Sequence, residues 1–520
     1  MHLRIPRSLP VALSLIFAAT ASAQLTLPRI LSNHMVVQRG LPVHVWGMAT
    51  PGEKVSVTFR GQFRSTAAGN LGHWSIYLPP GPAGGPFQMT IQGDTAASGS
   101  ASAQPQTIIL NDILVGDVWL ASGQSNMEFQ MYEAASASQD LPHAANPQMR
   151  LLIVKKDAAT APQADIQTDG WTASTPQSAK YFSAVAWYFA REIQQREHVP
   201  VGIIDSTWGG TPGEAWTRLT ALAENASLTP VFAAWGRMTE GYADALLRDK
   251  YRQQLIDEAK TQGKPAPYFP WIPPLNSWSP GVLWNGMIAP LTPFAIRGVI
   301  WYQGESNSGL DRAPLYGRVF RTLIRDWRRQ WCIGDFPFLY VQIANFKSTP
   351  LEDWATVREG QLKALELRDT AMAVTIDIGN PDNVHPTDKL DVSLRLARAA
   401  RALSYGEKIE YSGPLFRQAT PEGSTIRVWF DHAEGLSAKG DAITGFEVAG
   451  TDDKFFPATA VIDGQTVVAK SSQVATPLYV RYGWANSPNC NWVVCKVFWK
   501  DKTPPSLPPV IFPVTTAPLG

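Results

Sequence analysis

Short apolar runs alternate with amphipathic stretches through the middle of the chain. The run at 109–118 is apolar enough to be a buried strand, and the stretches at 183–196, 355–367 and 389–403 have the apolar spacing of helices. This alternation predicts parallel strands joined by helices, so we expect a three-layer α/β domain with a parallel sheet from residue 108 to residue 405. The other strand-like runs lie at 151–154, 201–204, 298–301, 338–341 and 371–376.

Short strand-like runs separated by turn residues flank this middle part on both sides. At 55–59, for example, apolar and polar residues alternate with period two, and a Pro-Gly turn at 51–52 precedes the run. We therefore expect two β-sandwich domains, one at 24–107 and one at 406–520. The small and polar residues of 95–106 predict a linker or an exposed loop.

An insertion near residues 240–285 interrupts the α/β pattern. Its first part is charged and helical, whereas its second part, 265–280, is rich in proline and contains Trp271 and Trp278. Two interpretations remain open for this second part. It is either a lid that walls a substrate cleft or a structural excursion that covers an edge of the sheet.

Residues 1–23 have the three parts of a secretory signal peptide. Arg4 and Arg7 form a basic head, 11–20 is an apolar run, and 21–23 (Ala-Ser-Ala) is a small-residue cleavage site. The apolar run is too short to span a bilayer, and no later segment reaches the roughly 20 apolar residues that a span needs. We therefore expect a soluble protein without a membrane span, either secreted or periplasmic.

Composition excludes several classes of partner. The 520 residues carry a formal net charge of +1, which gives no basic field for nucleic acid.

Of the three cysteines, Cys490 and Cys495 are close enough to form a small disulfide loop, and Cys332 is predicted to be buried and unreactive. No second cysteine pair or histidine cluster accompanies them, so we expect no metal site.

Ser125 is the first candidate catalytic residue. It follows the predicted strand at 109–118 after a turn of small residues. Open α/β sheets place their reactive groups at the carboxyl ends of their strands. A serine hydroxyl is a weak nucleophile unless a base takes its proton. A Gly-x-Ser tripeptide alone is common, so the chain must also supply a histidine and an acid.

His385 is the histidine best placed to be that base. It lies in the loop after the last apolar strand of the α/β domain, whereas the other seven histidines lie in the signal, in the flanking β regions or in surface contexts. Asp382, three residues earlier, can turn back and accept the Nδ1 hydrogen of His385, which leaves Nε2 free to face Ser125. The order along the chain would then be Ser, Asp, His.

Two further polar loops follow buried strands and are suited to an oxyanion hole. The loop at 205–212 contains Gly209 and Gly210, whose missing side chains allow a backbone N–H to approach a ligand closely. The loop at 301–307 offers the carboxamide of Gln303 as a donor. Four polar loops at strand ends of one domain predict an active site.

Together these motifs resemble the sialate O-acetylesterase family of the SGNH-hydrolase superfamily. The likeness covers nearly the whole mature chain. The motifs are Gly-Gln-Ser-Asn-Met at 123–127, Trp-Gly-Gly-Thr at 208–211, Trp-Tyr-Gln-Gly-Glu-Ser-Asn at 301–307 and Asp-Asn-Val-His-Pro at 382–386, and the segments at 34–39, 283–288 and 480–484 are also similar to that family.

The resemblance implies a role for each matching residue. Ser125 would be the nucleophile and, through its own N–H, one oxyanion donor, with His385 as the base and Asp382 as its orienter. The N–H of Gly210 and the side chain of Gln303 would complete the oxyanion hole. Because relatives also carry an acid elsewhere in this loop, Asp377 and Asp388 remain alternatives to Asp382.

The function expected from this reading is a secreted serine esterase that hydrolyses O-acetyl esters on carbohydrates through an acetyl-serine intermediate. We expect no cofactor, an O-acetylated sugar or glycan as substrate, and no nucleic-acid partner. The acetylated sugar is either sialic acid or a plant cell-wall polysaccharide such as xylan, xyloglucan or pectin. A non-catalytic carbohydrate-binding protein and a general esterase or lipase are the more distant alternatives, and the oligomeric state stays open.

Overall fold

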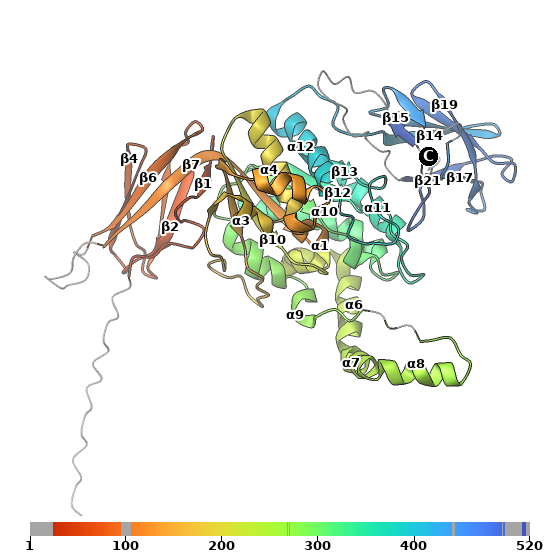
Figure 1. Ribbon diagram of the computed structural model, residues 1–520, viewed down its shortest axis with the longest axis horizontal. Helices are drawn as coiled ribbons and strands as arrows, with labels where there is room; N and C mark the ends of the chain where they lie inside the picture. Colours follow the sequence, from red (N-terminus) through yellow and green to blue (C-terminus); the bar gives the residue numbers. More distant parts are fainter. Residues whose placement is uncertain are drawn as a thin grey trace, which may run out of the picture.

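The computed structural model describes residues 24–94, 106–267, 269, 271–438, 443–490, 492–494 and 512–515. The predicted signal peptide at 1–23, almost all of the predicted linker at 95–106, and Cys495 lie outside these residues. Figure 1 shows the N-terminal strands at one end, a helix-rich body in the middle and the C-terminal strands at the other end.

The long strand β7 (Gln106–Gly123) joins the N-terminal strands to the central body. Its first part pairs antiparallel with β6 (Gly84–Gly93) and parallel with β1 (Val36–Gln38). Its second part lies between β10 (Val201–Thr207) and β11 (Gly298–Tyr302), parallel to both. The boundary predicted at 107/108 therefore falls inside a continuous strand, whose carboxyl end leads directly to Ser125.

The central sheet is mixed, and most of its strands are parallel. Its strand order is β13-β12-β11-β7-β10-β8-β9, in which only β9 runs antiparallel to its neighbour. Every strand-like run predicted between 108 and 376 overlaps one of these strands. The remaining members are β8 (Asn146–Ile153), β9 (Thr172–Ser174), β12 (Phe338–Gln342) and β13 (Thr370–Val374).

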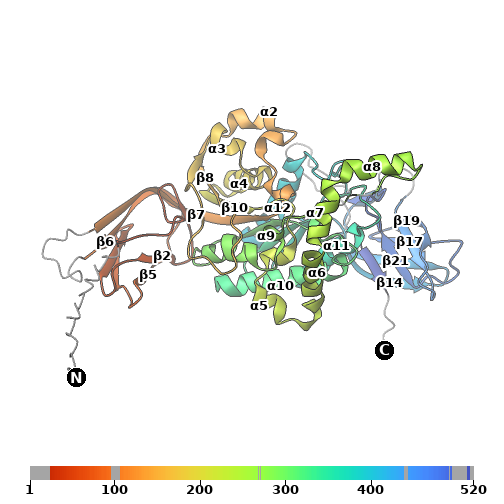
Figure 2. The same cartoon turned by 90° about the horizontal axis from the view of Figure 1, so that it is seen from below.

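Helices cover both faces of this sheet, as the register of its aromatic residues shows (Figure 2). Trp301 of β11 is aligned with Ser122 of β7, and its ring packs on Phe320 with centroids 6.3 Å apart. Trp119 lies three residues before Ser122, so it points to the opposite face, where it packs on Phe189 at 4.9 Å. The covering helices are α4 (Ala184–Glu197) and α12 (Lys389–Tyr405) on the Trp119 side, and α10 (Ala313–Trp331) and α11 (Trp354–Lys363) on the Trp301 side.

Additional antiparallel sheets lie at both ends of the chain. The C-terminal sheets enclose a core of their own, which includes Ile426, Val428, Val467 and Val480. The N-terminal strands are β2 (Val43–Met48), β3 (Lys54–Phe59), β4 (Gln62–Ala67) and β5 (His73–Leu78). The C-terminal strands are β14 (Leu415–Glu422), β15 (Thr425–Asp431), β16 (Leu436–Ala438), β17 (Phe446–Ala449), β18 (Phe456–Pro457), β19 (Thr459–Asp463), β20 (Thr466–Lys470), β21 (Tyr479–Tyr482), β22 (Trp492–Val494) and β23 (Phe512–Thr515).

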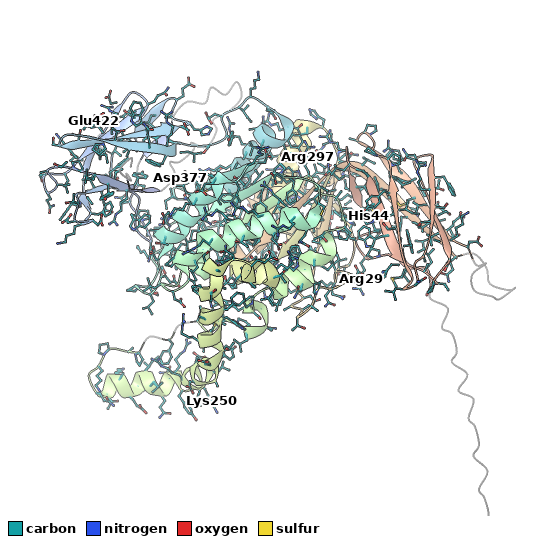
Figure 3. All side chains as sticks on the ribbon, turned by 180° about the vertical axis from the view of Figure 1, so that it is seen from behind. Arg29, His44, Lys250, Arg297, Asp377 and Glu422 are labelled. Atoms are coloured by element: carbon teal, nitrogen blue, oxygen red, sulfur yellow. The ribbon has the colours of Figure 1, made fainter. Side chains whose placement is uncertain are left out.

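The predicted insertion forms a helical arm that projects from the body (Figures 1 and 2). Lys250, labelled in Figure 3, is the last residue of α7 and lies at the bend of the arm, from which α8 extends. The arm consists of α6 (Thr229–Glu240), α7 (Tyr242–Lys250) and α8 (Arg252–Thr261), and α9 (Leu275–Trp278) follows closer to the body. The short helices elsewhere are α1 (Ser125–Glu128), α2 (Ala137–Asp140), α3 (Pro176–Lys180) and α5 (Leu219–Ala223).

Of the two predictions made for the cysteines, one is wrong and the other stays a prediction. Cys332 is exposed, so its predicted burial is wrong: it lies just after α10 in a left-handed conformation, with φ of 53°, where the helix ends at the surface. Cys490 is half-buried and burial raises its thiol pKa to about 11. Its pairing with Cys495 stays a prediction, because Cys495 is outside the described part of the chain.

The described part of the chain contains neither a candidate membrane-spanning helix nor a cluster of metal ligands. No helix in this part of the chain is long and apolar enough to cross a bilayer. Within the same residues, no three side chains of the His, Cys, Asp or Glu type come together as ligands for a metal ion.

Candidate active site

The structure brings Ser125 and His385 together, although 260 positions separate them in the sequence. Ser125 is the first residue of α1, directly after the carboxyl end of β7, and its Oγ lies 2.7 Å from Nε2 of His385. Gly123 makes the preceding turn possible, because its φ is +136° and a Cβ there would lie 2.2 Å from the carbonyl oxygen of Tyr302. The hydroxyl is therefore at hydrogen-bonding distance from a ring nitrogen.

The environment of His385 favours its neutral form. Burial lowers the pKa of the imidazole below its ordinary value, and the positive charge of Lys389 lowers it further, while Glu133 acts in the opposite direction. A neutral imidazole at physiological pH has a free lone pair, so His385 can take the proton of Ser125.

The third residue is not in contact with this pair. The carboxylate of Asp382 is 76% exposed and pairs with Nζ of Lys347 at 2.9 Å. Asp377 instead receives two hydrogen bonds from Arg395, at 2.7 and 2.8 Å. Among the described residues no carboxylate hydrogen-bonds to His385, so the expected contact between Asp382 and Nδ1 is absent from this arrangement.

The last alternative acid has a structural partner. Asp388 precedes α12, and its carboxylate accepts a hydrogen bond of 3.1 Å from the backbone N–H of Asp391. Such a cap satisfies an N–H group that the first helical turn leaves without a partner. Asp388 therefore stabilises the start of α12.

The glycine turn at 209–210 lies directly against the serine. A Cβ placed on Gly209 would be 3.3 Å from Cβ of Ser125, and Gly210 has φ of +73°. The carboxylate of Glu128 holds this turn, because its Oε2 accepts a hydrogen bond of 2.5 Å from the N–H of Gly209 and its Oε1 pairs with Lys156. Sequence reasoning missed Glu128, although it lies only three residues after Ser125.

Gln303 does not offer the free donor that the sequence predicts. Its side chain is fully buried, and its Nε2 donates to Oδ1 of Asn307 at 2.7 Å and to the carbonyl of Thr211 at 3.2 Å. Both amide hydrogens therefore have protein partners. In this arrangement Gln303 joins the loop after β11 to the loop after β10, and the N–H groups of Ser125 and Gly210 remain as predicted oxyanion donors.

Two tryptophans of the insertion lie beside the glycine turn. Nε1 of Trp278 donates a hydrogen bond of 2.6 Å to the carbonyl of Gly210, and a Cβ placed on Gly210 would lie 3.0 Å from the indole of Trp271. The two rings are 5.8 Å apart, and Trp271 is 61% exposed. Of the two interpretations of this segment, the contacts favour a wall of the site.

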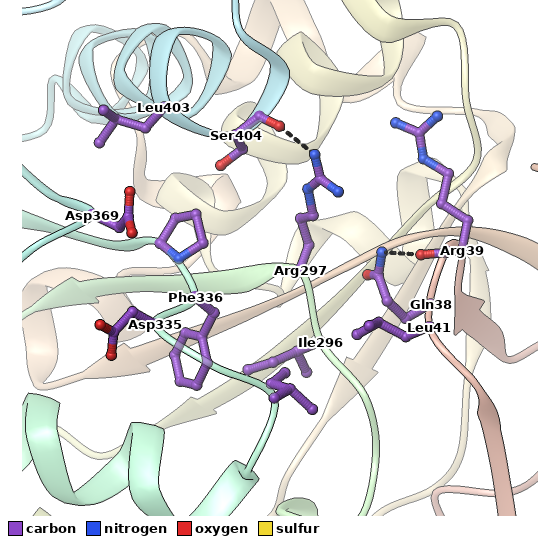
Figure 4. A pocket seen from close by; sticks show the side chains of 13 residues that line it. Gln38, Arg39, Leu41, Ile296, Arg297, Asp335, Phe336, Asp369, Leu403 and Ser404 are labelled. Atoms are coloured by element: carbon purple, nitrogen blue, oxygen red, sulfur yellow. Dashed lines mark hydrogen bonds between the residues drawn. The ribbon is translucent and has the colours of Figure 1, made fainter. Parts of the chain in front are cut away.

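A separate hollow, drawn in Figure 4, lies at the amino ends of the strands, opposite the carboxyl ends that Ser125 follows. It has a volume of about 360 Å³, and its lining includes Arg39, Arg297 and Phe336. Arg297 and Phe336 precede β11 and β12, so the hollow is at the amino ends of these strands. It is therefore distinct from the site at Ser125, which follows the carboxyl end of β7.

Sequence comparisons decide the family. Residues 274–403, which contain His385, match the family described as "Carbohydrate esterase, sialic acid-specific acetylesterase". The chain is also 30% identical over 521 residues to a sialate O-acetylesterase from Rattus norvegicus, a match that covers 92% of each protein. The chain belongs to the sialate O-acetylesterase family. A human sialate O-acetylesterase is 30% identical as well, over 93% of this chain and 91% of the human protein.

A solved structure agrees with membership of the sialate O-acetylesterase family. A carbohydrate acetylesterase from Xanthomonas citri is 36% identical, with a TM-score of 0.78, and the match covers 95% of this chain and all of the other. The resemblance drawn from four short motifs is thus confirmed, and the protein is a carbohydrate acetylesterase similar to sialate O-acetylesterases.

Proposed function

We propose that this protein is an exported serine esterase that removes O-acetyl groups from carbohydrate hydroxyls through an acetyl-serine intermediate. The 2.7 Å contact between Ser125 and His385 is the observation that carries this proposal. For the fold we propose the three-layer arrangement typical of SGNH hydrolases, with the antiparallel sheets at each end forming β-sandwiches. Export rests on the signal-like sequence of residues 1–23.

The reaction follows from the geometry of the pair. Oγ of Ser125 attacks the acetyl carbonyl as Nε2 of His385 takes its proton, and the backbone N–H groups of Ser125 and Gly210 stabilise the oxyanion. The bond between the carbonyl carbon and the sugar oxygen then breaks, and His385 returns the proton to that oxygen. Water, deprotonated by the same imidazole, then attacks the acetyl-serine. The bond between Oγ and the acetyl carbon breaks, acetate is released, and His385 returns the proton to Oγ.

The names of the relatives leave the sugar open between sialic acid and other carbohydrates. The mammalian relatives are sialate O-acetylesterases, whereas the Xanthomonas citri protein is a carbohydrate acetylesterase. We therefore propose an O-acetylated sialic acid as the first candidate substrate and an acetylated plant polysaccharide as the second. Acetate release from acetylated sialic acid, xylan, xyloglucan and pectin, measured side by side, decides between them, and release from none of them would count against a carbohydrate substrate.

We propose Asp382 as the acid that orients His385, because its exposed side chain can turn from Lys347 towards Nδ1 of His385. Exposed ion pairs such as that of Asp382 with Lys347 contribute at most about 1 kcal/mol. A hydrogen bond from Nδ1 of His385 to Asp382 that is only modestly more favourable is therefore enough to break this ion pair. The rival Asp377 is fixed by two hydrogen bonds from Arg395, whose side chain is only 3% exposed.

Substitution of the two carboxylates separates their roles. Asp382→Asn is expected to lower kcat at least tenfold, because the imidazole loses its orientation and the partner of its charged form. Asp377→Asn removes the carboxylate charge that pairs with the buried guanidinium of Arg395, so it is expected to lower the melting temperature more than kcat. Steady-state kinetics and thermal denaturation of both variants test this assignment, and wild-type kcat in Asp382→Asn would contradict it.

Trp271 is predicted to bind the sugar rather than the acetyl group. Its exposed indole beside Gly210 offers a flat apolar face, and burial of such a face gains about 1 kcal/mol or more. Trp271→Ala is therefore expected to raise KM for an acetylated glycan about five- to tenfold. The KM for a small activated acetyl ester, which has no sugar ring, should stay unchanged. Equal effects on both substrates would contradict a sugar-binding role.

A further inference from the structure

A buried polar bridge connects the residue after the nucleophile to the residue before the base. Asn126 follows Ser125, and its Nδ2 donates a hydrogen bond of 3.0 Å to the carbonyl of Val384, which precedes His385. Asn126 is only 1% exposed. One carboxamide thus spans the two segments that carry the reacting groups, which otherwise come from opposite ends of the α/β domain.

Two buried ionisable side chains hold this carboxamide from either side. Nζ of Lys389, the first residue of α12, donates a hydrogen bond of 2.6 Å to Oδ1 of Asn126. Oε1 of Glu305 accepts a hydrogen bond of 2.6 Å from Nδ2 of the same amide. Lys389 is 1% exposed and Glu305 is 9% exposed, so neither charge faces water. This pattern fixes which end of the amide points to Val384.

Two aromatic rings also contact the ammonium group of the lysine. Its Nζ lies over the rings of Phe129 and Tyr302, 4.6 and 5.4 Å from their centroids. Burial of an ammonium group is costly unless hydrogen bonds or nearby charges compensate for it. The hydrogen bond from Nζ to Oδ1 of Asn126 is the contact that a methionine or leucine of similar size could not make.

We propose that Lys389 is a positioning residue for the acyl-transfer reaction. Its ammonium orients the carboxamide of Asn126, and that carboxamide keeps the main chain of His385 at the distance at which the imidazole meets the serine hydroxyl. This inference rests on the proposed function. Displacement of a reacting group by about 1 Å can cost about 100-fold in rate, so a fixed bridge between the two segments has a large effect on kcat.

The charge of Lys389 has a second effect, on the protonation of His385. Burial lowers the pKa of Lys389 to about 7, against the effects of Glu305 and Asp388, which raise it. The lysine therefore gains its charge as the pH falls below neutral, in the range where an imidazole takes up a proton. Of the charged groups that act on His385, Lys389 opposes this protonation and Glu133 favours it. The positive charge thus keeps the base neutral at lower pH.

The test uses Lys389→Met and Asn126→Ala in the full-length protein, with Lys363→Met as a matched control. Lys363 is exposed and pairs with Glu359 on α11, and it makes none of the contacts of the bridge. Rates are divided by the concentration of active sites, titrated with a serine-reactive fluorophosphonate, so that loss of folded protein does not count as loss of kcat. The pH dependence of kcat/KM and thermal denaturation are recorded for each variant.

Both bridge variants are expected to lose kcat about 10- to 100-fold per active site, with KM for a small acetyl ester changed less than threefold. In Lys389→Met the acid limb of kcat/KM should also move to higher pH, because the imidazole then protonates more easily. Asn126→Ala keeps the charge, so its acid limb should stay closer to that of the wild type. Lys363→Met should match the wild type in every measurement.

Wild-type kcat and an unmoved acid limb in Lys389→Met would overturn the proposal. If that variant does not fold, Asn126→Ala decides, and wild-type kcat per active site in Asn126→Ala would overturn the proposal as well. Failure of the proposed function is distinguishable, because in that case Ser125→Ala would retain the acetylesterase activity of the wild type whatever the bridge variants do.

Discussion

Ser125→Ala is expected to reduce kcat for an activated acetyl ester by about 10⁴- to 10⁶-fold. The substitution removes the Oγ that lies 2.7 Å from His385, so no acetyl-enzyme can form and only the residual effect of the oxyanion donors remains. Release of the leaving group, followed by absorbance, and release of acetate from a glycan measure this loss. Both should fall together.

Ser122→Ala is the matched control for this variant. Ser122 lies three residues earlier, near the end of β7, is fully buried, and its Oγ has no hydrogen-bond partner among the described residues. Its removal takes an equal number of atoms from β7 without touching the reacting pair, so kcat should change less than twofold. A wild-type rate in Ser125→Ala would end the assignment of the nucleophile.

His385→Ala is expected to have the second-largest effect, a loss of about 10⁴-fold in kcat with loss of the acid limb of the pH profile. In the wild type, the base works only when the imidazole is neutral. Because burial and Lys389 lower the pKa of His385, kcat/KM should stay level near neutral pH and fall only in the mildly acidic range, as the imidazole gains its proton. The variant has no imidazole at this position, so its residual rate should not show that fall.

His143→Ala serves as the control, since His143 is an exposed histidine in a short helical turn of the same domain. It should keep both the rate and the acid limb of the wild type. An acid limb that persists unchanged in His385→Ala would show that a different group is the base.

The sequence predicts the parts of the fold and of the site that depend on local patterns. Each apolar run of the α/β domain overlaps a strand of the central sheet, because buried parallel strands need continuous apolar residues whatever their neighbours are. The meeting of Ser125 and His385 follows from the same rule. Both residues follow strands of one parallel sheet, and the carboxyl ends of such strands share an edge.

Local sequence patterns do not predict the contacts between separate loops. Asp382 was expected to reach its near neighbour His385, but Lys347, 35 positions away, holds the carboxylate instead. Gln303 was expected to face the substrate, yet Asn307 and Thr211 occupy its amide hydrogens. Each outcome depends on how separate loops pack, which spacing in the sequence does not record.

The sequence pattern also does not predict which polar residues are buried. Lys389 begins an amphipathic helical stretch, and a lysine in that position is normally exposed. Here the start of α12 lies against Phe129 and Tyr302, so its side chain is covered. The pattern also predicts the strand that becomes β7, but it gives no sign that the strand continues through two different sheets.

Labelling of the serine tests the central claim most directly. The wild-type protein is treated with a fluorophosphonate in increasing amounts, and the fraction of Ser125 modified, determined by peptide mass spectrometry, is compared with the remaining rate of acetate release. If Ser125 and His385 form the reacting pair, activity should fall in proportion to modification of Ser125 and reach zero when every Ser125 is blocked. Protein that is fully modified at Ser125 and still releases acetate at the wild-type rate would contradict the account.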